Sequence, residues 1–184
     1  METRIVVNAP GRNARAAFAL LIAVGFAGCH RDRRVRVQTD EEPPRLAMML
    51  SVADPRAATQ LINGFYSLEN NSWRWTAGKF TVMLRPPRAA ETNGAVLKFK
   101  FNLPEAVLSK VKTLAISANV NGTALSPESY TQPGEYTYTR EVPPKAFTGD
   151  AAKVEFTLDK FLPPSSSDLR ELGVIATMVG FEGK

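Results

Sequence analysis

Alternation of apolar and polar residues with a period of two is the feature that most limits how this chain can fold. The stretch "LKFKFNL" places Leu97, Phe99, Phe101 and Leu103 on one side of an extended segment and polar side chains on the other. Successive side chains of a strand point to opposite faces, so such a segment buries one face and exposes the other. The pattern predicts half-buried strands.

The same alternation recurs along the second half of the chain. The residues expected to point inward are Phe80, Val82 and Leu84, then Leu114, Ile116, Ala118 and Val120, and then Val154, Phe156 and Leu158. In "EYTYTREV", residues 135–142, we expect Tyr136 and Tyr138 to share an inward face. The final "LGVIATMVGFE" is apolar on both faces, which indicates a strand covered on both sides.

Turn signals separate these segments. Asn121-Gly122 fits a type I′ hairpin turn, and Pro143-Pro144 and "PPSSSD" at 163–168 end other runs. Only "PEAVLSKV", residues 104–111, has the composition of a helix. Short strands with one brief helix predict an all-β fold, an antiparallel β-sandwich with jelly-roll or Greek-key connections.

The positive charge of the chain is confined to its N-terminal segment. Residues 1–36 contain seven of the 23 basic residues and two of the 18 acidic ones, and the rest of the chain contains 16 of each. A nucleic-acid-binding domain normally has a basic face of its own. We therefore expect no nucleic-acid partner.

The same segment has the organisation of a secretory signal. An arginine-bearing start is followed by the apolar run 16–26 and by the small residues Ala27 and Gly28. The run is shorter than the roughly 20 residues that a membrane-spanning helix needs. We predict a signal peptide at 1–28, a flexible tether at 29–56, where charged blocks and a Pro-Pro pair occur, and the sandwich domain at 57–184.

The sequence "FAGC", which ends at Cys29, resembles the lipobox of bacterial lipoproteins. The resemblance implies that Cys29 receives lipid, becomes the first mature residue and anchors the protein to a membrane of the cell envelope. His30, rather than Asp, follows the cysteine, as in lipoproteins with an outer-membrane address. The alternatives are an ordinary signal peptide or a wrong start codon, with Cys29 incidental.

The sequence lacks the residues that several catalytic mechanisms require. The one histidine is His30 and the one cysteine is Cys29, so a domain at 57–184 has no Ser-His-Asp or Cys-His centre and no zinc site of His or Cys ligands. No glycine-rich phosphate loop follows a strand. We expect no enzymatic activity and no cofactor, with an oxygen-ligated calcium site left open. A carboxylate-based hydrolase is the remaining enzymatic alternative, with candidates Glu69, Glu128, Asp168 and Glu171.

Two segments, 62–84 and 168–182, resemble a bacterial β-sandwich module of the jelly-roll, galactose-binding-like type. The shared pattern is Gly64-Phe65-Tyr66, an acidic residue at Glu69, Arg74-Trp75, and Asp168, Arg170, Leu172 and Gly173. The resemblance implies a carbohydrate-binding-module-like sandwich of envelope and carbohydrate-active proteins.

"NNSWRW", residues 70–75, contains both tryptophans of the chain. One interpretation is that Trp75 fills the core while Arg74 pairs with Glu69 or Asp168. The other is a sugar-binding platform of Trp73 and Arg74, with Arg170 nearby, because sugar rings stack on indole and charged groups hold their hydroxyls. Our hypothesis is a non-enzymatic envelope lipoprotein that binds a carbohydrate or another envelope component, with a purely structural or protein-interaction lipoprotein as the alternative.

Overall fold

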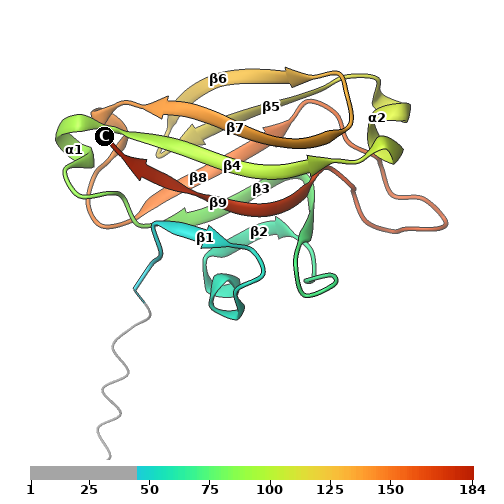
Figure 1. Cartoon of the computed structure of the whole chain (residues 1–184), viewed down its shortest axis with the longest axis horizontal. Helices are drawn as coiled ribbons and strands as arrows, with labels where there is room; N and C mark the ends of the chain where they lie inside the picture. Colours follow the sequence, from blue (N-terminus) through green and yellow to red (C-terminus); the bar gives the residue numbers. More distant parts are fainter. Residues whose placement is uncertain (1–44) are drawn as a thin grey trace, which may run out of the picture. The chain divides into compact units, whose positions relative to one another are not determined.

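The computed structural model describes residues 45–184, and residues 1–44, with the predicted signal peptide and Cys29, lie outside the described part. The described residues form nine strands, two short α-helices and two 3-10 helices (Figure 1). The strands are β1 Met49–Ser51, β2 Leu61–Phe65, β3 Arg74–Leu84, β4 Ala95–Leu103, β5 Leu114–Val120, β6 Thr123–Tyr130, β7 Gly134–Val142, β8 Ala152–Leu158 and β9 Ile175–Gly183. The helices are η1 Pro55–Thr59, α1 Ala90–Asn93, α2 Glu105–Val111 and η2 Pro144–Ala146.

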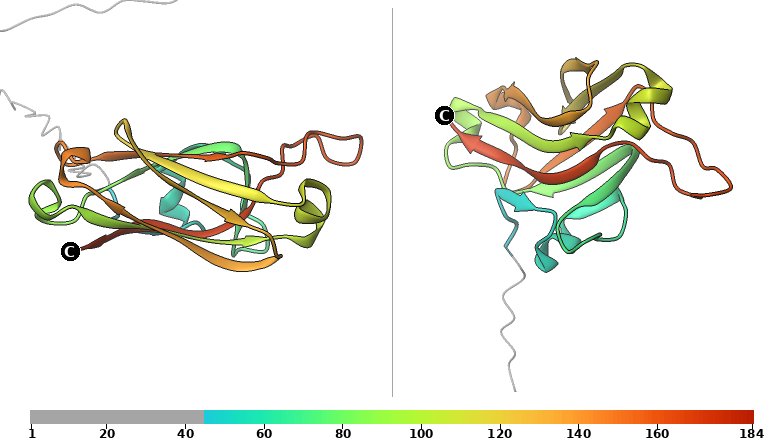
Figure 2. Two further views of the ribbon diagram at one scale, coloured as in Figure 1. Left: turned by 90° about the horizontal axis from the view of Figure 1, so that it is seen from above. Right: turned by 45° about the vertical axis from the view of Figure 1, so that its right-hand side comes forward.

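The strands form an antiparallel sandwich with the topology of a jelly roll. One sheet has the order β1-β9-β4-β7, and the other has the order β2-β3-β8-β5-β6. β3 joins both sheets, because Arg74 and Trp75 pair with β9 before the strand continues beside β8. Apart from β2, which extends an edge, this order is that of two interlocked Greek keys. The two layers are visible in Figure 2.

Phenylalanine rings from both sheets form the centre of the core. Phe80 of β3 lies 4.9 Å from Phe156 of β8 and 5.3 Å from Phe99 of β4, measured between ring centroids. All three rings are essentially inaccessible to solvent. Such ring pairs add to the stabilisation from buried apolar area. The inward residues predicted for β3, β4, β5 and β8 are buried, which confirms those faces.

The predicted turns and helix are also present. Asn121 and Gly122 both have positive φ, 47° and 89°, in the hairpin between β5 and β6. α2 begins after Pro104, as the sequence predicts. α1 was not predicted, since its four residues lie between a Pro-Pro pair and Gly94, where no helical period can develop.

The predicted domain boundary at Ala57 is wrong. Leu50 and Val52 are buried in the core, and β1 pairs with β9 ahead of that position. Buried Gln60 also holds the segment before Ala57 against the domain. Its side-chain oxygen accepts a hydrogen bond from the Ala47 N–H, and its side-chain NH2 donates to the Ala47 carbonyl. The part of the predicted tether from Arg45 onward therefore belongs to the sandwich.

The prediction that the last strand is covered on both sides is wrong, because the outer face of β9 has exposed and half-buried residues. Gly180 is buried against Met49 of β1, so a Cβ there would lie 2.6 Å from the Met49 sulfur. Thr177, on the outer face, is exposed, and Met178 is half-buried. β1 lies beside β9 in the same sheet, so it packs against Gly180 at the edge of the sheet and does not form a second layer over β9. No helix within residues 45–184 is long and apolar enough to span a membrane.

Candidate functional site

The predicted site residues lie at one end of the sandwich, where the β2–β3 and β8–β9 loops meet. In the β2–β3 loop, Asn70 and Asn71 adopt positive φ and reverse the chain, so that the Glu69 N–H donates to the Trp73 carbonyl at 2.9 Å. Glu69 and Trp73 form an antiparallel bridge. Paired residues of such a bridge project their side chains to the same face. Glu69, Trp73 and, two residues on, Trp75 therefore share one face.

The two indole rings occupy different positions on that face. Their centroids are 6.3 Å apart, with the rings nearly perpendicular. Trp75 is half-buried and packs against the core. Trp73 is half-buried too, but it is not part of the core cluster. Trp73 therefore keeps ring area at the surface, whereas Trp75 supports it from below.

Arg74 does not make the contacts predicted for it. Its side chain points to the opposite face, where Nε donates to the Val52 carbonyl at 3.0 Å and Nη1 to the Tyr66 carbonyl at 3.0 Å. The guanidinium joins the segment after β1 to the end of β2. Both predictions, an ion pair with Glu69 or Asp168 and a platform shared with Trp73, are therefore wrong.

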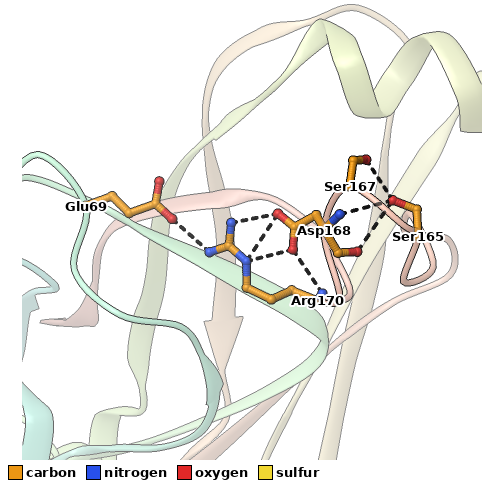
Figure 3. A network of polar contacts seen from close by, with 5 residues as sticks. All are labelled: Glu69, Ser165, Ser167, Asp168 and Arg170. Carbon is orange, nitrogen blue, oxygen red and sulfur yellow. Dashed lines mark hydrogen bonds and ion pairs between the residues drawn. The ribbon is translucent and has the colours of Figure 1, made fainter.

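Arg170 makes the ion pairs instead (Figure 3). Its Nη1 lies 2.8 Å from the Glu69 Oε1, and its Nη2 lies 2.8 Å from the Asp168 Oδ2. The guanidinium carbon lies 5.3 Å from the centre of the Tyr66 ring, a cation–π distance. The Arg170 cluster, which we define as Arg170, Glu69 and Asp168, thus joins two loops about a hundred residues apart in sequence.

The Arg170 hydrogen bonds hold the pKa of Asp168 at about 2, and the two carboxylates raise the pKa of Arg170. Asp168 and Arg170 are therefore both charged across the physiological range. Three of the five N–H donors of Arg170 have protein partners, since Nε bonds to Asp168 as well. The side chains of the cluster are each about one-third exposed, so the cluster is partly accessible to solvent.

The β8–β9 loop is closed upon itself. Leu162 and Leu172 exchange two backbone hydrogen bonds at its base, of 2.9 and 3.0 Å. Near its tip the Ser165 N–H donates to the Asp168 carbonyl at 2.7 Å, and the Ser165 and Ser167 hydroxyls are 3.0 Å apart, as Figure 3 shows. These contacts fix Asp168 and Arg170 in position without a ligand.

Each of the four carboxylates considered for hydrolysis has a partner within the protein. Glu128 is bound by Arg140 at 2.6 Å, and Glu171 accepts a hydrogen bond from the Gly78 N–H at 3.2 Å. Glu69 and Asp168 lie together but share the guanidinium of Arg170. A general acid needs a raised pKa, and that of Asp168 is lowered. Within residues 45–184 no group of three or more His, Cys, Asp or Glu side chains could hold a metal ion.

The residues of this site were predictable from the sequence, but their pairing was not. Tyr66, whose ring lies under the Arg170 guanidinium, was named only as part of the motif shared with the β-sandwich module. The hollow beside α2 was not predicted. Proximity in sequence favoured Arg74 as the partner of Glu69. The chain reversal at Asn70 and Asn71 was the one signal that could have placed Glu69 and Trp73 opposite each other.

No protein-family model and no curated protein matches the chain. Among solved structures it is similar to the crystal structure of the CBM36-1 domain of a multidomain xylanase from the hindgut metagenome of Trinervitermes trinervoides. The TM-score is 0.41, with 10% sequence identity, over 74% of this chain and 96% of that chain. A TM-score of this size does not establish a shared fold, so the jelly-roll assignment rests on the strand order.

Proposed function

We propose that this protein is a non-enzymatic lipoprotein of the cell envelope whose sandwich binds a carbohydrate at the end where the β2–β3 and β8–β9 loops meet. The observation that carries the proposal is the position of Trp73. Its half-buried ring lies on the same face as Glu69, and Glu69 is held by Arg170.

This pairing of groups fits the chemistry of a sugar. The apolar C–H face of a pyranose ring packs on an aromatic surface such as that of Trp73. Its hydroxyls are both donors and acceptors, so they can meet the carboxylate lone pairs and the free guanidinium N–H groups at the same time. A single ligand lying across Trp73 and the Arg170 cluster would use both.

The charge of the site favours a neutral sugar. Two carboxylates to one guanidinium leave the Arg170 cluster with a net negative charge. A uronic acid or a sulfated sugar would be repelled by Glu69 and Asp168. We therefore infer that the ligand is an uncharged glycan of the envelope or of its surroundings.

A glycan panel tests the proposal. Neutral and acidic oligosaccharides are titrated into the protein while heat and tryptophan fluorescence are recorded. We expect a neutral member to bind, and Trp73→Ala to weaken its binding at least tenfold, which corresponds to about 1.4 kcal/mol. Ile62→Ala, which removes an exposed apolar side chain of β2, is the control and should leave the affinity unchanged. If no glycan gives heat or a fluorescence change, the proposal is wrong and a protein-docking lipoprotein is favoured.

Anchoring through Cys29 is the second part of the proposal. Its support is the apolar run 16–26 that ends in "FAGC", and Cys29 itself lies outside the described residues. We expect the parent protein to partition with membranes and to carry an acylated N-terminal cysteine detectable by mass spectrometry. Cys29→Ser should give an uncleaved or soluble species, and equal partitioning of the two forms would contradict lipidation.

A further inference from the structure

A hollow of about 430 Å³ adjoins the Arg170 cluster. It lies between α2 and the β8–β9 loop, with Ala106 and Lys110 on the helix side and Leu162, Pro163, Pro164 and Leu172 on the loop side. Figure 1 shows both elements at the same end of the sandwich. Asp168 and Arg170 form part of the same wall.

Arg170 therefore faces two surfaces at once. One nitrogen of its guanidinium binds Glu69, which lies on the face of Trp73, and another binds Asp168, which lines the hollow. A ligand that contacts Trp73 and continues past the guanidinium enters the space beside α2. The guanidinium of Arg170 thus connects the face of Trp73, through Glu69, with the wall of the hollow, through Asp168.

We propose that this hollow is a second sugar subsite, so that the ligand is an oligosaccharide chain that spans Trp73 and the hollow rather than a single sugar. The inference rests on the proposed function and adds to it the length of the ligand. The proposed occupant of the hollow is a further neutral pyranose unit of the same glycan.

The lining of the hollow matches such a unit. Its volume lies within the range of about 300–1,000 Å³ that small-molecule sites occupy. Leucine and proline side chains supply an apolar wall, while Ser165, Ser167 and Asp168 supply hydroxyl and carboxylate partners. A pyranose ring has an apolar face and a polar edge, and this lining can receive both.

Lys110 adds a hydrogen-bond donor with no competing partner. Its side chain is exposed, and its ammonium group has no hydrogen bond or ion pair within residues 45–184. An ammonium group donates to sugar hydroxyls and carries three N–H bonds. The net negative charge of the Arg170 cluster on the same wall offsets its positive charge, so the hollow suits an uncharged ligand.

The hollow is also formed in advance. The Leu162–Leu172 bridge closes the base of the loop, and the Ser165–Asp168 contacts close its tip. A preformed site avoids the cost of ordering a loop when the ligand binds.

A length series of oligosaccharides tests the inference. β-1,4-linked chains of glucose, xylose and N-acetylglucosamine, each of one to six units, are titrated by calorimetry into the parent protein. We expect affinity in the series that binds to rise about tenfold or more at one step, where the chain first reaches the hollow. Affinity that does not change beyond the shortest bound chain would overturn the inference while leaving the proposed function intact.

Two variants on α2 locate that step. Ala106→Phe places a ring in the hollow from an exposed helical position and should remove the step while the shortest bound chain keeps its affinity. The matched control is Ser109→Phe, on the exposed side of the same helix but outside the hollow, which should bind as the parent does. Lys110→Ala, which removes the hydrogen-bond donor and adds no bulk, should reduce the rise in affinity at that step.

The remaining outcomes are also decisive. A step that persists in both Ala106→Phe and Lys110→Ala places the extra contacts elsewhere and overturns the inference. If no chain of any series binds, the proposed function fails and the inference fails with it. Loss of binding to all chain lengths in Trp73→Ala, with the step lost in Ala106→Phe and retained in Ser109→Phe, supports both.

Discussion

Arg74 and Arg170 place the same guanidinium group in different surroundings. Arg74 donates to the carbonyl groups of Val52 and Tyr66 and so fastens one loop to another, whereas Arg170 is bound by two carboxylates that are partly open to solvent. The "WRW" pattern put Trp73 and Trp75 on one face and Arg74 on the other, as the period of a strand requires. It could not show which arginine meets Glu69, because that contact depends on a loop far away in sequence.

Because of Asp168, we expect the stability of the fold to depend on pH in the acid range. Its pKa is about 2 in the folded protein and close to its ordinary 3.8 in the unfolded chain. The carboxylate is charged in both states above about pH 5, where its stabilising effect is complete. As the pH falls from about 5 to about 2, Asp168 is protonated in the unfolded chain before it is protonated in the folded protein. The stabilisation therefore declines over this range and is gone below about pH 2.

Urea unfolding of the parent and Asp168→Asn measures this effect. We expect the parent to be the more stable at pH 6 and the difference between the two free energies of unfolding to shrink as the pH is lowered from 5 to 2.5. A difference that stays constant over that range would show that the Arg170–Asp168 pair does not contribute through its charge. Asp150→Asn is the control, since the Asp150 side chain is exposed and has no ion-pair partner within residues 45–184, so this change should leave the stability close to that of the parent at each pH.

Strands with a regular buried face were predictable from the sequence, whereas the edge strands β2 and β6 were not. β4 and β8 pack their apolar residues against the opposite sheet, and this requirement produces a regular period of two. β6 is an edge strand that contains Pro127, and β2 is interrupted by Gly64 at φ 72°. Edge strands tolerate such residues because one side makes no ladder hydrogen bonds, and this tolerance removes the sequence signal.

Gly173, where the β8–β9 loop returns to the sheet, has no room for a side chain. A Cβ there would lie 2.5 Å from the Leu158 Cδ1 and 2.9 Å from the Ala77 carbonyl oxygen. We expect Gly173→Ala to lower the free energy of unfolding by about 1–3 kcal/mol, as overpacked cores do, and to weaken glycan binding by displacing Arg170. Denaturant unfolding and calorimetry measure the two effects.

Gly183→Ala is the matched control for this substitution. Its Cβ would meet its nearest neighbour at 3.5 Å, an ordinary contact, so we expect stability and binding close to those of the parent. Equal stability of the two variants would mean that the loop can shift at its base, and the Arg170 cluster would then not be held rigidly.

At the scale of the whole molecule, the sandwich starts earlier than its composition suggests. The charged and proline-containing segment that ends near Arg45 predicted a tether as far as residue 56, but only three residues of β1 are needed to place Leu50 in the core. A strand of three residues is too short for a period of two to be recognised. Its register is set instead by hydrogen bonds to β9.

Two truncated chains test this boundary. A chain that begins at Arg45 should unfold at the same urea concentration as the full chain. One that begins at Ala57 lacks Leu50, Val52 and the Ala47 partner of Gln60, so it should lose about 3 kcal/mol or more of stability. Equal stability of the two fragments would return the boundary to Ala57.

The position of the bound glycan is the most direct test of the account. Amide and indole N–H resonances of the ¹⁵N-labelled chain from Arg45 onward are followed during titration with the oligosaccharide that binds best in the panel. We predict shifts of the Trp73 indole and of backbone amides within 67–73 and 162–172, with the β5–β6 hairpin at Asn121 unchanged. Shifts confined to the polar hollow of about 670 Å³ on the outer face of β3, β8 and β5, at Lys79, Thr157 and Ser117, with the Trp73 indole unmoved, would contradict it.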